Sequence, residues 1–237
     1  MRNKWNSSRM IDFKNPREVA RIIDQTLLQP TAREDQVQIF CEEAVALGFA
    51  AVCIAPIWVR LAVKVAKTTG VRVCTVAGFP FGFETTEGKV RSMQAALDTG
   101  AEEIDYVVNL GAVKGRHYIL VAAEMEAMRR GAGNAVVKVI LETGYLTKNE
   151  KKRLCKLAVS TGLDFVKTAT GFGPSGASAA EIKLLAQYGK GRIKIKAAGG
   201  IRTIEDLETM VGAGAHRIGT SSGKEIISQI AARKQVK

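Results

Sequence analysis

Eight short runs of β-branched and apolar residues, each followed by a segment with helical periodicity, organise this chain. The expected strands cover residues 24–28, 50–56, 71–79, 103–109, 135–142, 165–170, 192–198 and 216–222. Strands that alternate with helices form parallel sheets, and strands rich in Val and Ile are buried on both faces. Eight such units within 237 residues favour a closed barrel over an open sheet. The sequence therefore predicts an α/β fold, a single (β/α)8 barrel with a short helix before the first strand.

Two expected helix starts carry capping residues. Ser178 with Glu181 forms the capping box S-x-x-E, and Thr203 with Asp206 resembles it.

No linker or low-complexity stretch divides the chain, so residues 13–237 are expected to form one barrel domain. Residues 1–12 are basic and polar, and we expect them to be a flexible tail. They lack the apolar region of a secretory signal, and no apolar run reaches the roughly 18 residues that a membrane span requires. We therefore expect a cytoplasmic protein with no membrane partner.

The formal net charge is +12, yet the Lys and Arg residues are scattered along amphipathic segments, and aromatic residues make up only 6% of the chain. A nucleic-acid surface would be expected to combine a basic stripe with aromatic residues, so we expect no nucleic-acid partner. The excess charge indicates a solvated surface that also attracts phosphorylated substrates. Because barrels often associate, a homodimer is a further expectation.

Three expected strands each carry one lysine among apolar residues. Lys138, Lys167 and Lys196 are spaced 29 residues apart, which is one strand–helix unit, and the preceding strand carries Asp105. A single strand lysine usually points outward or pairs with a carboxylate. Three at equal spacing beside an aspartate instead favour a cluster at the carboxyl ends of the strands, where barrel active sites lie.

Such a cluster suits covalent catalysis by an amine. A lysine is almost fully protonated at pH 7, because its reference pKa is about 10.4. The neighbouring charge of Lys196 and the loss of water both disfavour the ammonium form, which lowers the pKa and makes the amine nucleophilic. One lysine would then attack a carbonyl, a second would keep the first deprotonated, and Asp105 would transfer protons through a water molecule.

Two glycine-rich segments predict a phosphate site. Residues 197–202 (AAGGIR) follow the seventh expected strand, and residues 218–223 (IGTSSG) end the eighth. Barrels often bind phosphate with the loops at these two positions, through backbone N–H groups and a helix N-terminus. Residues 171–176 (GFGPSG) fit the dinucleotide pattern G-x-G-x-x-G, but Pro174 disfavours a helix opening inside the motif, so we expect no dinucleotide site there.

Metal and redox centres are not expected. His117 and His216 are the only histidines, too few for the His cluster of a typical zinc enzyme. The four cysteines show no CxxC pairing and fall in apolar segments, so they are interpreted as buried free thiols: Cys41, Cys53, Cys74 and Cys155.

Several segments together resemble the deoxyribose-phosphate aldolase family over about residues 17–230. These segments are IDQTLL, GFPFGFETTE, EIDYVVNLGAVKGR, VKVILETGYL, FVKTATGFGPSGAS, IKAAGGIRT and RIGTSSG. The resemblance implies a class I aldolase that reversibly cleaves 2-deoxy-D-ribose 5-phosphate into acetaldehyde and D-glyceraldehyde 3-phosphate, with neither a metal nor an organic cofactor.

The resemblance also implies residue roles. Lys167 matches the Schiff-base lysine, Lys196 the lysine that tunes it, and Asp105 the proton-transfer aspartate. Supporting positions are Asp24, Lys138 and Thr168, although Lys138 fits a paired structural charge equally well. The phosphate loops correspond to Gly171, Gly199, Gly200, Gly219, Ser221 and Ser222.

This chain departs from the family pattern at several positions. Gln25, Gln29 and Ala55 stand where the family often has His, Lys and Asn, and the C-terminal tyrosine of some members is missing. These differences leave substrate preference and turnover open. Two alternatives therefore stay in view: a Schiff-base aldolase for another aldehyde, and a non-catalytic basic binding protein on the same fold.

Overall fold

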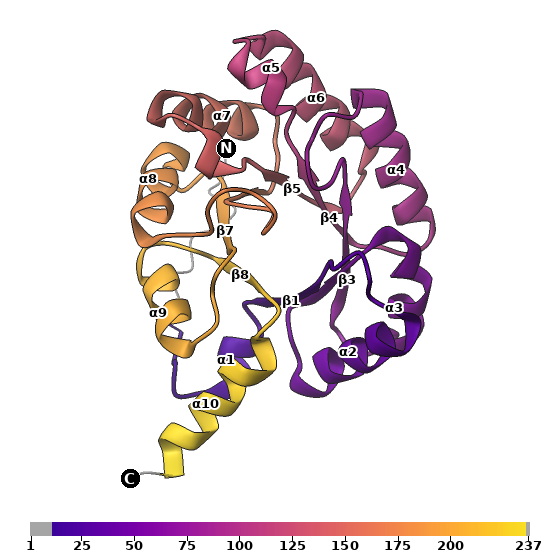
Figure 1. Ribbon diagram of the computed structural model, residues 1–237, viewed down its shortest axis with the longest axis vertical. Coiled ribbons are helices and arrows are strands. Elements are labelled where there is room, and N and C mark those ends of the chain that lie inside the picture. The colour runs from indigo at the N-terminus through magenta and orange to yellow at the C-terminus, as the bar shows by residue number, and fades with distance from the viewer. Residues whose placement is uncertain (1–10, 236–237) are drawn as a thin grey trace.

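The computed structural model describes residues 11–235, and within them eight parallel strands close into a barrel in the order of the sequence. Their bounds are β1 Ile23–Leu27, β2 Ala51–Ile54, β3 Arg72–Ala77, β4 Glu103–Val107, β5 Val136–Ile140, β6 Phe165–Lys167, β7 Lys194–Ala198 and β8 Arg217–Thr220. Figure 1 shows the helices arranged around this ring of strands. The predicted (β/α)8 barrel is therefore confirmed. For residues 1–10, the expected tail lies outside the described part of the chain.

The helices alternate with the strands. Their bounds are α1 Pro16–Ala20, α2 Glu34–Leu47, α3 Val59–Ala66, α4 Thr86–Asp98, α5 Leu110–Lys114, α6 Tyr118–Gly131, α7 Lys148–Ser160, α8 Ala179–Gly189, α9 Ile204–Gly212 and α10 Gly223–Gln235, with short 3-10 turns at Pro56–Trp58 and Thr143–Tyr145. The expected short helix before the first strand is α1, which packs beside α10 (Figure 1). Among the described residues, no helix combines the length and the apolar character that crossing a membrane requires.

The barrel separates two apolar layers. The large core lies between the outward faces of the strands and the helices, and it includes residues such as Val137, Val139 and Leu154. A much smaller apolar cluster fills part of the barrel interior, formed by Ala51, Cys53, Cys74 and Val76. Because side chains alternate along a strand, one face of each strand serves each layer. Charged side chains, with Phe165 packed against Lys138 and Arg217, occupy much of the remaining interior.

Helix starts follow the expected capping chemistry with one correction. Thr203 and Asp206 form a complete capping box at the start of α9. At the start of α8, Ser178 Oγ accepts from the backbone N–H of Glu181 at 3.3 Å, but the Glu181 carboxylate instead accepts from Lys151 Nζ at 2.9 Å. The expected box at α8 is therefore only half formed, because Lys151 on α7 offers the carboxylate a charged donor.

Strand β6 is shorter than the expected run 165–170. The ladder ends at Lys167, and Thr168 then connects the ends of β6 and β7 with its side chain. Its Oγ1 donates to the carbonyl of Ala198 at 2.9 Å and accepts from the N–H of the same residue at 3.0 Å. Side-chain bonds thus replace ladder bonds where the chain turns away, and they fix the two strand ends that carry Lys167 and Lys196.

Candidate active site

A cluster of seven charged side chains occupies the barrel interior. Its members come from six strands and are all largely buried: Asp24, Glu103, Asp105, Lys138, Lys167, Lys196 and Arg217. The sequence predicted five of them, and the structure brings those five together. Burying so many charges is unfavourable unless each finds an opposite partner and further hydrogen bonds, so the pairing inside the cluster must be nearly complete.

Asp105 is the centre of this cluster. Its Oδ2 lies 2.8 Å from the Nζ atoms of both Lys167 and Lys196, and its Oδ1 lies 2.8 Å from Lys138 Nζ. The thiol of Cys74 also donates to Oδ1, at 3.3 Å. Burial by itself would raise the pKa of Asp105, but the three ammonium charges outweigh burial and hold that pKa well below its usual range. Asp105 is therefore an anion at neutral pH.

The three lysines do not all lie at one level. Lys167 and Lys196 are direct partners in the β6–β7 register, as expected. Lys138, however, is opposite Phe165, two residues before Lys167, so the expected alignment of all three is wrong. Equal sequence spacing does not ensure equal height, because neighbouring strands of a barrel are staggered. Lys138 therefore sits deeper, at the level of Asp105.

The deep position of Lys138 gives it several carboxylate partners. Its Nζ lies 2.5 Å from Glu103 and 3.8 Å from Asp24, in addition to its bond with Asp105. Burial lowers the pKa of Lys138, but the negative charges around it, led by Asp105, raise that pKa well above its usual value. Lys138 is thus a permanently charged group that holds three carboxylates together.

Lys196 is also firmly held as a cation. Its Nζ lies 2.5 Å from Asp24 Oδ2 and 2.8 Å from Asp105 Oδ2. Burial again opposes the charge, but Asp105 and Asp24 outweigh it and raise the pKa of Lys196 well above its usual value. Asp24 in turn forms an ion pair with Arg217. Burial raises the pKa of Asp24, but the charges of Arg217, Lys196 and Lys138 outweigh burial, so that this pKa is lowered.

Lys167 differs from the other two lysines. Within the described residues, Asp105 is the carboxylate that lies at ion-pair distance from its Nζ. It also lines a pocket of about 260 Å³ at the carboxyl ends of the strands, and so can meet a molecule that enters from solvent. Lys167 is therefore the cluster lysine that combines access with the fewest charged partners.

The predicted phosphate loops line the same pocket. Its wall includes Gly171, Gly199, Gly200, Gly219 and Ser221. Helix α10 begins directly after the loop that holds Gly219 and Ser221, so the N-terminus of this helix adds backbone N–H groups and positive potential near the pocket. Arg202, which sequence reasoning missed, also lines the pocket, and the signal was its place two residues after the glycine pair.

Ser222 fits the predicted loop only in part. It is not among the residues that line the pocket, and its backbone N–H already donates to Thr220 Oγ1 at 2.9 Å. The next N–H, of Gly223, donates to Gln25 Oε1 at 3.0 Å, while Gln25 Nε2 donates to the carbonyl of Ser221 at 3.3 Å. Gln25 therefore fastens the loop to β1 from outside the pocket, whereas Gln29 lines the pocket itself.

The glycine-rich segment 171–176 packs against the loop after β7. A Cβ atom on Gly176 would lie 2.4 Å from the carbonyl oxygen of Gly199, so glycine is required at this close approach. The N–H of Ala177 donates to the same carbonyl at 3.0 Å. Helix α8 begins only at Ala179, so no helix opens inside this motif, as Pro174 indicated.

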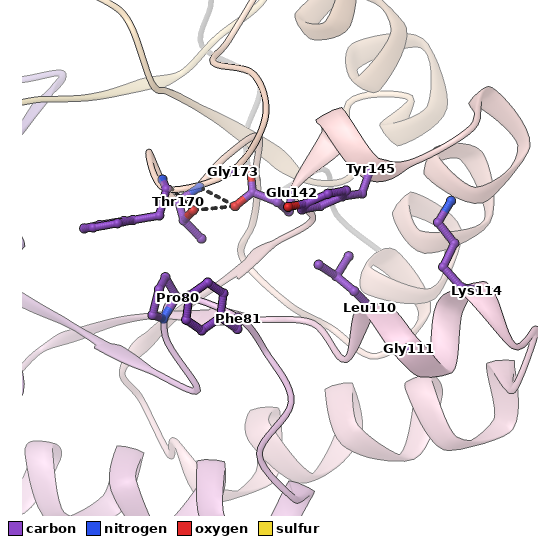
Figure 2. A pocket seen from close by; sticks show the side chains of 10 residues that line it. Pro80, Phe81, Leu110, Gly111, Lys114, Glu142, Tyr145, Thr170 and Gly173 are labelled. Carbon is purple, nitrogen blue, oxygen red and sulfur yellow. Dashed lines mark hydrogen bonds between the residues drawn. The ribbon is translucent and has the colours of Figure 1, made fainter.

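A second pocket of about 310 Å³ adjoins the first at Thr170 and Phe172. Figure 2 shows that Glu142 and Thr170 lie together on one side of this pocket, across from Pro80 and Phe81. The buried Glu142 carboxylate accepts from the N–H of Thr170 at 3.0 Å and from its Oγ1. Glu142 has a backbone φ of 52°, an uncommon value for a non-glycine residue. These bonds hold the start of the 170–176 loop in place.

Glu103 and Arg217 were also missed by sequence reasoning. Glu103 precedes Asp105 by two residues, so the strand period already places both carboxylates on one face. Arg217 opens β8 and pairs with both Asp24 and Glu103. The role of Arg217 could not be found from sequence, because Arg217 and Asp24 are almost two hundred positions apart.

Among the described residues, one set of side chains has metal-ligand spacing. The ligand atoms of Cys53, Cys74 and Asp105 lie within 4.8 Å of one another. However, Asp105 is already bound by three ammonium groups, and Lys138 Nζ lies 3.4 Å from Cys74 Sγ. These positive charges would repel a divalent cation, so the set does not fit a metal site.

The charged cluster should make stability depend on acid. The pKa values of Asp24, Glu103 and Asp105 are all lowered in the folded protein. Their stabilisation is therefore fully present above their unfolded pKa values, about 4, and is lost as the pH falls toward the folded values. Between pH 5 and pH 3, we expect the free energy of unfolding measured in urea to fall less steeply with decreasing pH in Glu103→Gln than in wild type. The difference between the two slopes should be up to about 1.4 kcal/mol per pH unit.

The control for this titration is Glu126→Gln, which changes an exposed glutamate on α6 and should keep the wild-type slope. Equal slopes for wild type and Glu103→Gln would contradict the assignment of a lowered pKa to Glu103.

Comparison with known proteins agrees with this geometry. The model of the DeoC/LacD family of aldolases matches residues 19–229. Deoxyribose-phosphate aldolase from Bacillus subtilis is 48% identical over 210 residues, with coverage of 88% of this chain and 94% of that protein. The enzyme of the same name from Halalkalibacterium halodurans is 46% identical over 214 residues, with coverage of 90% and 96%.

A solved structure agrees with these sequence matches. The deoxyribose phosphate aldolase from Aeropyrum pernix, described as a tetramer, superposes with a TM-score of 0.86 at 33% identity, covering 96% of this chain and 99% of that one. Sequence and fold thus agree over nearly the whole length, and the chain belongs to the DeoC/LacD family of aldolases.

Proposed function

We propose that this protein is a deoxyribose-phosphate aldolase of class I, which cleaves 2-deoxy-D-ribose 5-phosphate reversibly into acetaldehyde and D-glyceraldehyde 3-phosphate. The relatives above carry that name. The observation that carries the proposal is the bridge formed by Asp105 between Lys167 and Lys196, beside a pocket lined with glycine loops. Neither a metal nor an organic cofactor takes part in the proposed reaction.

The chemistry begins with Lys167 as the nucleophile. Its neutral amine attacks the aldehyde carbon of the open-chain sugar, and loss of water gives a protonated Schiff base. Removal of the proton from the C3 hydroxyl breaks the C2–C3 bond and releases glyceraldehyde 3-phosphate, while the bond electrons form an enamine. Protonation at C2 and hydrolysis then release acetaldehyde and restore the amine. We assign the proton transfers to Asp105 acting through a water molecule.

Charge balance supports Lys167 as the neutral lysine. The cluster holds four cations, Arg217 and the three lysines, against three carboxylates. Because Lys138 and Lys196 have raised pKa values, they keep their protons. The half-exposed Arg72 also pairs with Glu103, so cations outnumber carboxylates, and loss of one proton from Lys167 would reduce this excess of positive charge.

The phosphate group is proposed to bind at the glycine loops. Gly171, Gly199, Gly200 and Gly219 let the backbone approach the anion, Ser221 offers a hydroxyl donor, and Arg202 supplies a charge at the pocket wall. The net charge of +12 would assist the capture of an anionic sugar phosphate.

We also propose a cytoplasmic enzyme that assembles as a homodimer. All four cysteines are free thiols, which is typical of a reducing compartment. Phe81 and Phe83 stack at 5.5 Å between ring centroids and are 58% and 76% exposed, which makes them candidates for a contact between subunits. Light scattering on the purified protein should give twice the mass of one chain; a monomer or tetramer would contradict the dimer.

Substitution Lys167→Ala should abolish cleavage because no Schiff base can form. We expect release of glyceraldehyde 3-phosphate to fall at least about a thousandfold in a coupled assay. Borohydride with acetaldehyde should add a two-carbon group to Lys167 of the wild-type protein, as peptide mass spectrometry would show.

The matched control is Lys194→Gln, on the same strand as Lys196 but at the opposite end of the barrel. This variant should still be labelled at Lys167. Labelling at another lysine, or full activity of Lys167→Ala, would refute the assigned nucleophile. Salt-sensitive nucleic-acid binding without cleavage would favour the binding-protein alternative.

Substitution Ser221→Asp should place a negative charge in the phosphate loop and repel the substrate phosphate. We expect KM for deoxyribose 5-phosphate to rise by about tenfold or more, with a smaller change for unphosphorylated 2-deoxyribose. The control Ser228→Asp adds the same charge to an exposed position on α10 and should leave KM near the wild-type value. An equal effect on both sugars would remove Ser221 from the phosphate site.

A further inference from the structure

Two cysteines lie side by side inside the barrel. Cys53 on β2 and Cys74 on β3 are direct partners in the strand register, and both are completely buried in the small inner cluster. Their sulfur atoms lie within 4.8 Å of each other and of a carboxylate oxygen of Asp105. The proposed reaction gives neither thiol a role.

We propose that Cys53 and Cys74 are a redox modification site, which a hydroperoxide oxidises to a reversible disulfide that suppresses catalysis by displacing the contacts of Asp105. The existence of the disulfide stands on the cysteine geometry alone. Its effect on catalysis rests on the proposed function.

Strand geometry allows this bond with little backbone movement. Neighbouring strands lie about 4.7–4.9 Å apart, and the Cα atoms of disulfide-bonded cysteines are usually about 4.4–6.8 Å apart. Because Cys53 and Cys74 are register partners, their side chains point to the same face of the sheet. Cys41 on α2 and Cys155 on α7 belong to the outer core instead. Helices α2 and α7 lie on opposite sides of the barrel in Figure 1, so Cys41 and Cys155 are not placed to pair with each other.

The surroundings assign different roles to the two thiols. The neighbouring Cys74 thiol, with help from the charges of Lys196 and Lys167, outweighs burial and lowers the pKa of Cys53. Burial and the neighbouring Cys53 thiol raise the pKa of Cys74 well above its usual value. Cys53 is therefore the thiol that becomes a thiolate and reacts first, and Cys74 is the resolving thiol. Because both sulfurs are fully buried, a small peroxide would have to pass Lys167, which lines the pocket and contacts Asp105 beside them.

The chemistry balances with a hydroperoxide as the oxidant. The Cys53 thiolate attacks one peroxide oxygen, so that an S–O bond forms and the O–O bond breaks. With hydrogen peroxide, the leaving group is hydroxide, which takes up the proton that the Cys53 thiol released and departs as water. Cys74 then attacks the sulfenic sulfur, an S–S bond replaces the S–O bond, and the released hydroxide takes the Cys74 proton. Two thiols are oxidised and one peroxide is reduced to two waters.

The disulfide would disturb the group that joins the catalytic lysines. In the reduced protein, Cys74 donates to Asp105 Oδ1 at 3.3 Å and accepts from Lys138 Nζ at 3.4 Å. A disulfide has no S–H donor, and it draws Cys74 Sγ toward β2. Asp105 would then lose its hydrogen bond at Oδ1, and the shift of Cys74 would change the surroundings of Lys138, which contacts both that sulfur and the same oxygen.

The experiment treats the full-length protein with excess hydrogen peroxide and then divides the sample. Peptide mass spectrometry without reductant should find one linked pair, Cys53 with Cys74, lighter by two hydrogens than the two peptides together. In the cleavage assay, kcat/KM should fall by about tenfold or more and recover after dithiothreitol.

Variants separate this site from general oxidation. Cys74→Ala should give no linked pair, and Cys53 should instead be trapped by dimedone as a sulfenic acid. Cys41→Ala should behave as wild type, because Cys41 lies in the outer core. Circular dichroism of each variant establishes that it is folded.

The outcomes distinguish the site from the proposed function. Absence of the Cys53–Cys74 pair, or a pair that contains Cys41 or Cys155, overturns the modification site. A linked protein that keeps full activity overturns the effect on catalysis. Failure of the borohydride label at Lys167 in reduced protein would instead refute the proposed function, while the linked peptide would still report on the cysteines.

Discussion

The Asp105 carboxylate, bound by three lysine side chains inside a barrel, is the interaction on which the site depends. Breaking a buried ion pair by removing one partner typically costs about 3–5 kcal/mol, because the other charge stays buried and unpaired. Asp105 is shared by Lys138, Lys167 and Lys196, so each lysine is held by the same anion. This sharing explains how a protein interior can keep several lysines within reach of one another.

The barrel makes such an arrangement possible because strand ends converge at one mouth. Lys138 lies deeper than Lys167 and ties the carboxylates together, whereas Lys167 reaches the pocket. The same mouth carries the glycine loops, and Gln25 fastens the last of them to β1. The deep charged residues around Lys138 therefore support the shallower Lys167, which is the proposed nucleophile. Substrate recognition would take place in the backbone loops above both.

Sequence patterns predicted much of this arrangement, with errors that have physical causes. The alternation of strands and helices was sufficient for the barrel, and the register of Lys167 with Lys196 agrees with their spacing of one strand–helix unit. Lys138 was misplaced because strand stagger has no signal in spacing. Ser178 was expected to begin a full capping box, but a lysine from the neighbouring helix took the carboxylate that would have completed it.

By itself, the sequence determined the fold class, the family and the identity of the central lysines and aspartate, because these depend on local period and on motifs within single strand–loop units. Only the tertiary structure decided which charges neutralise one another. Arg217 pairs with Asp24 where β8 closes onto β1, and Cys53 and Cys74 are register partners on the neighbouring strands β2 and β3. Side-chain reach and strand stagger set such contacts, and neither is written in the order of residues along the chain.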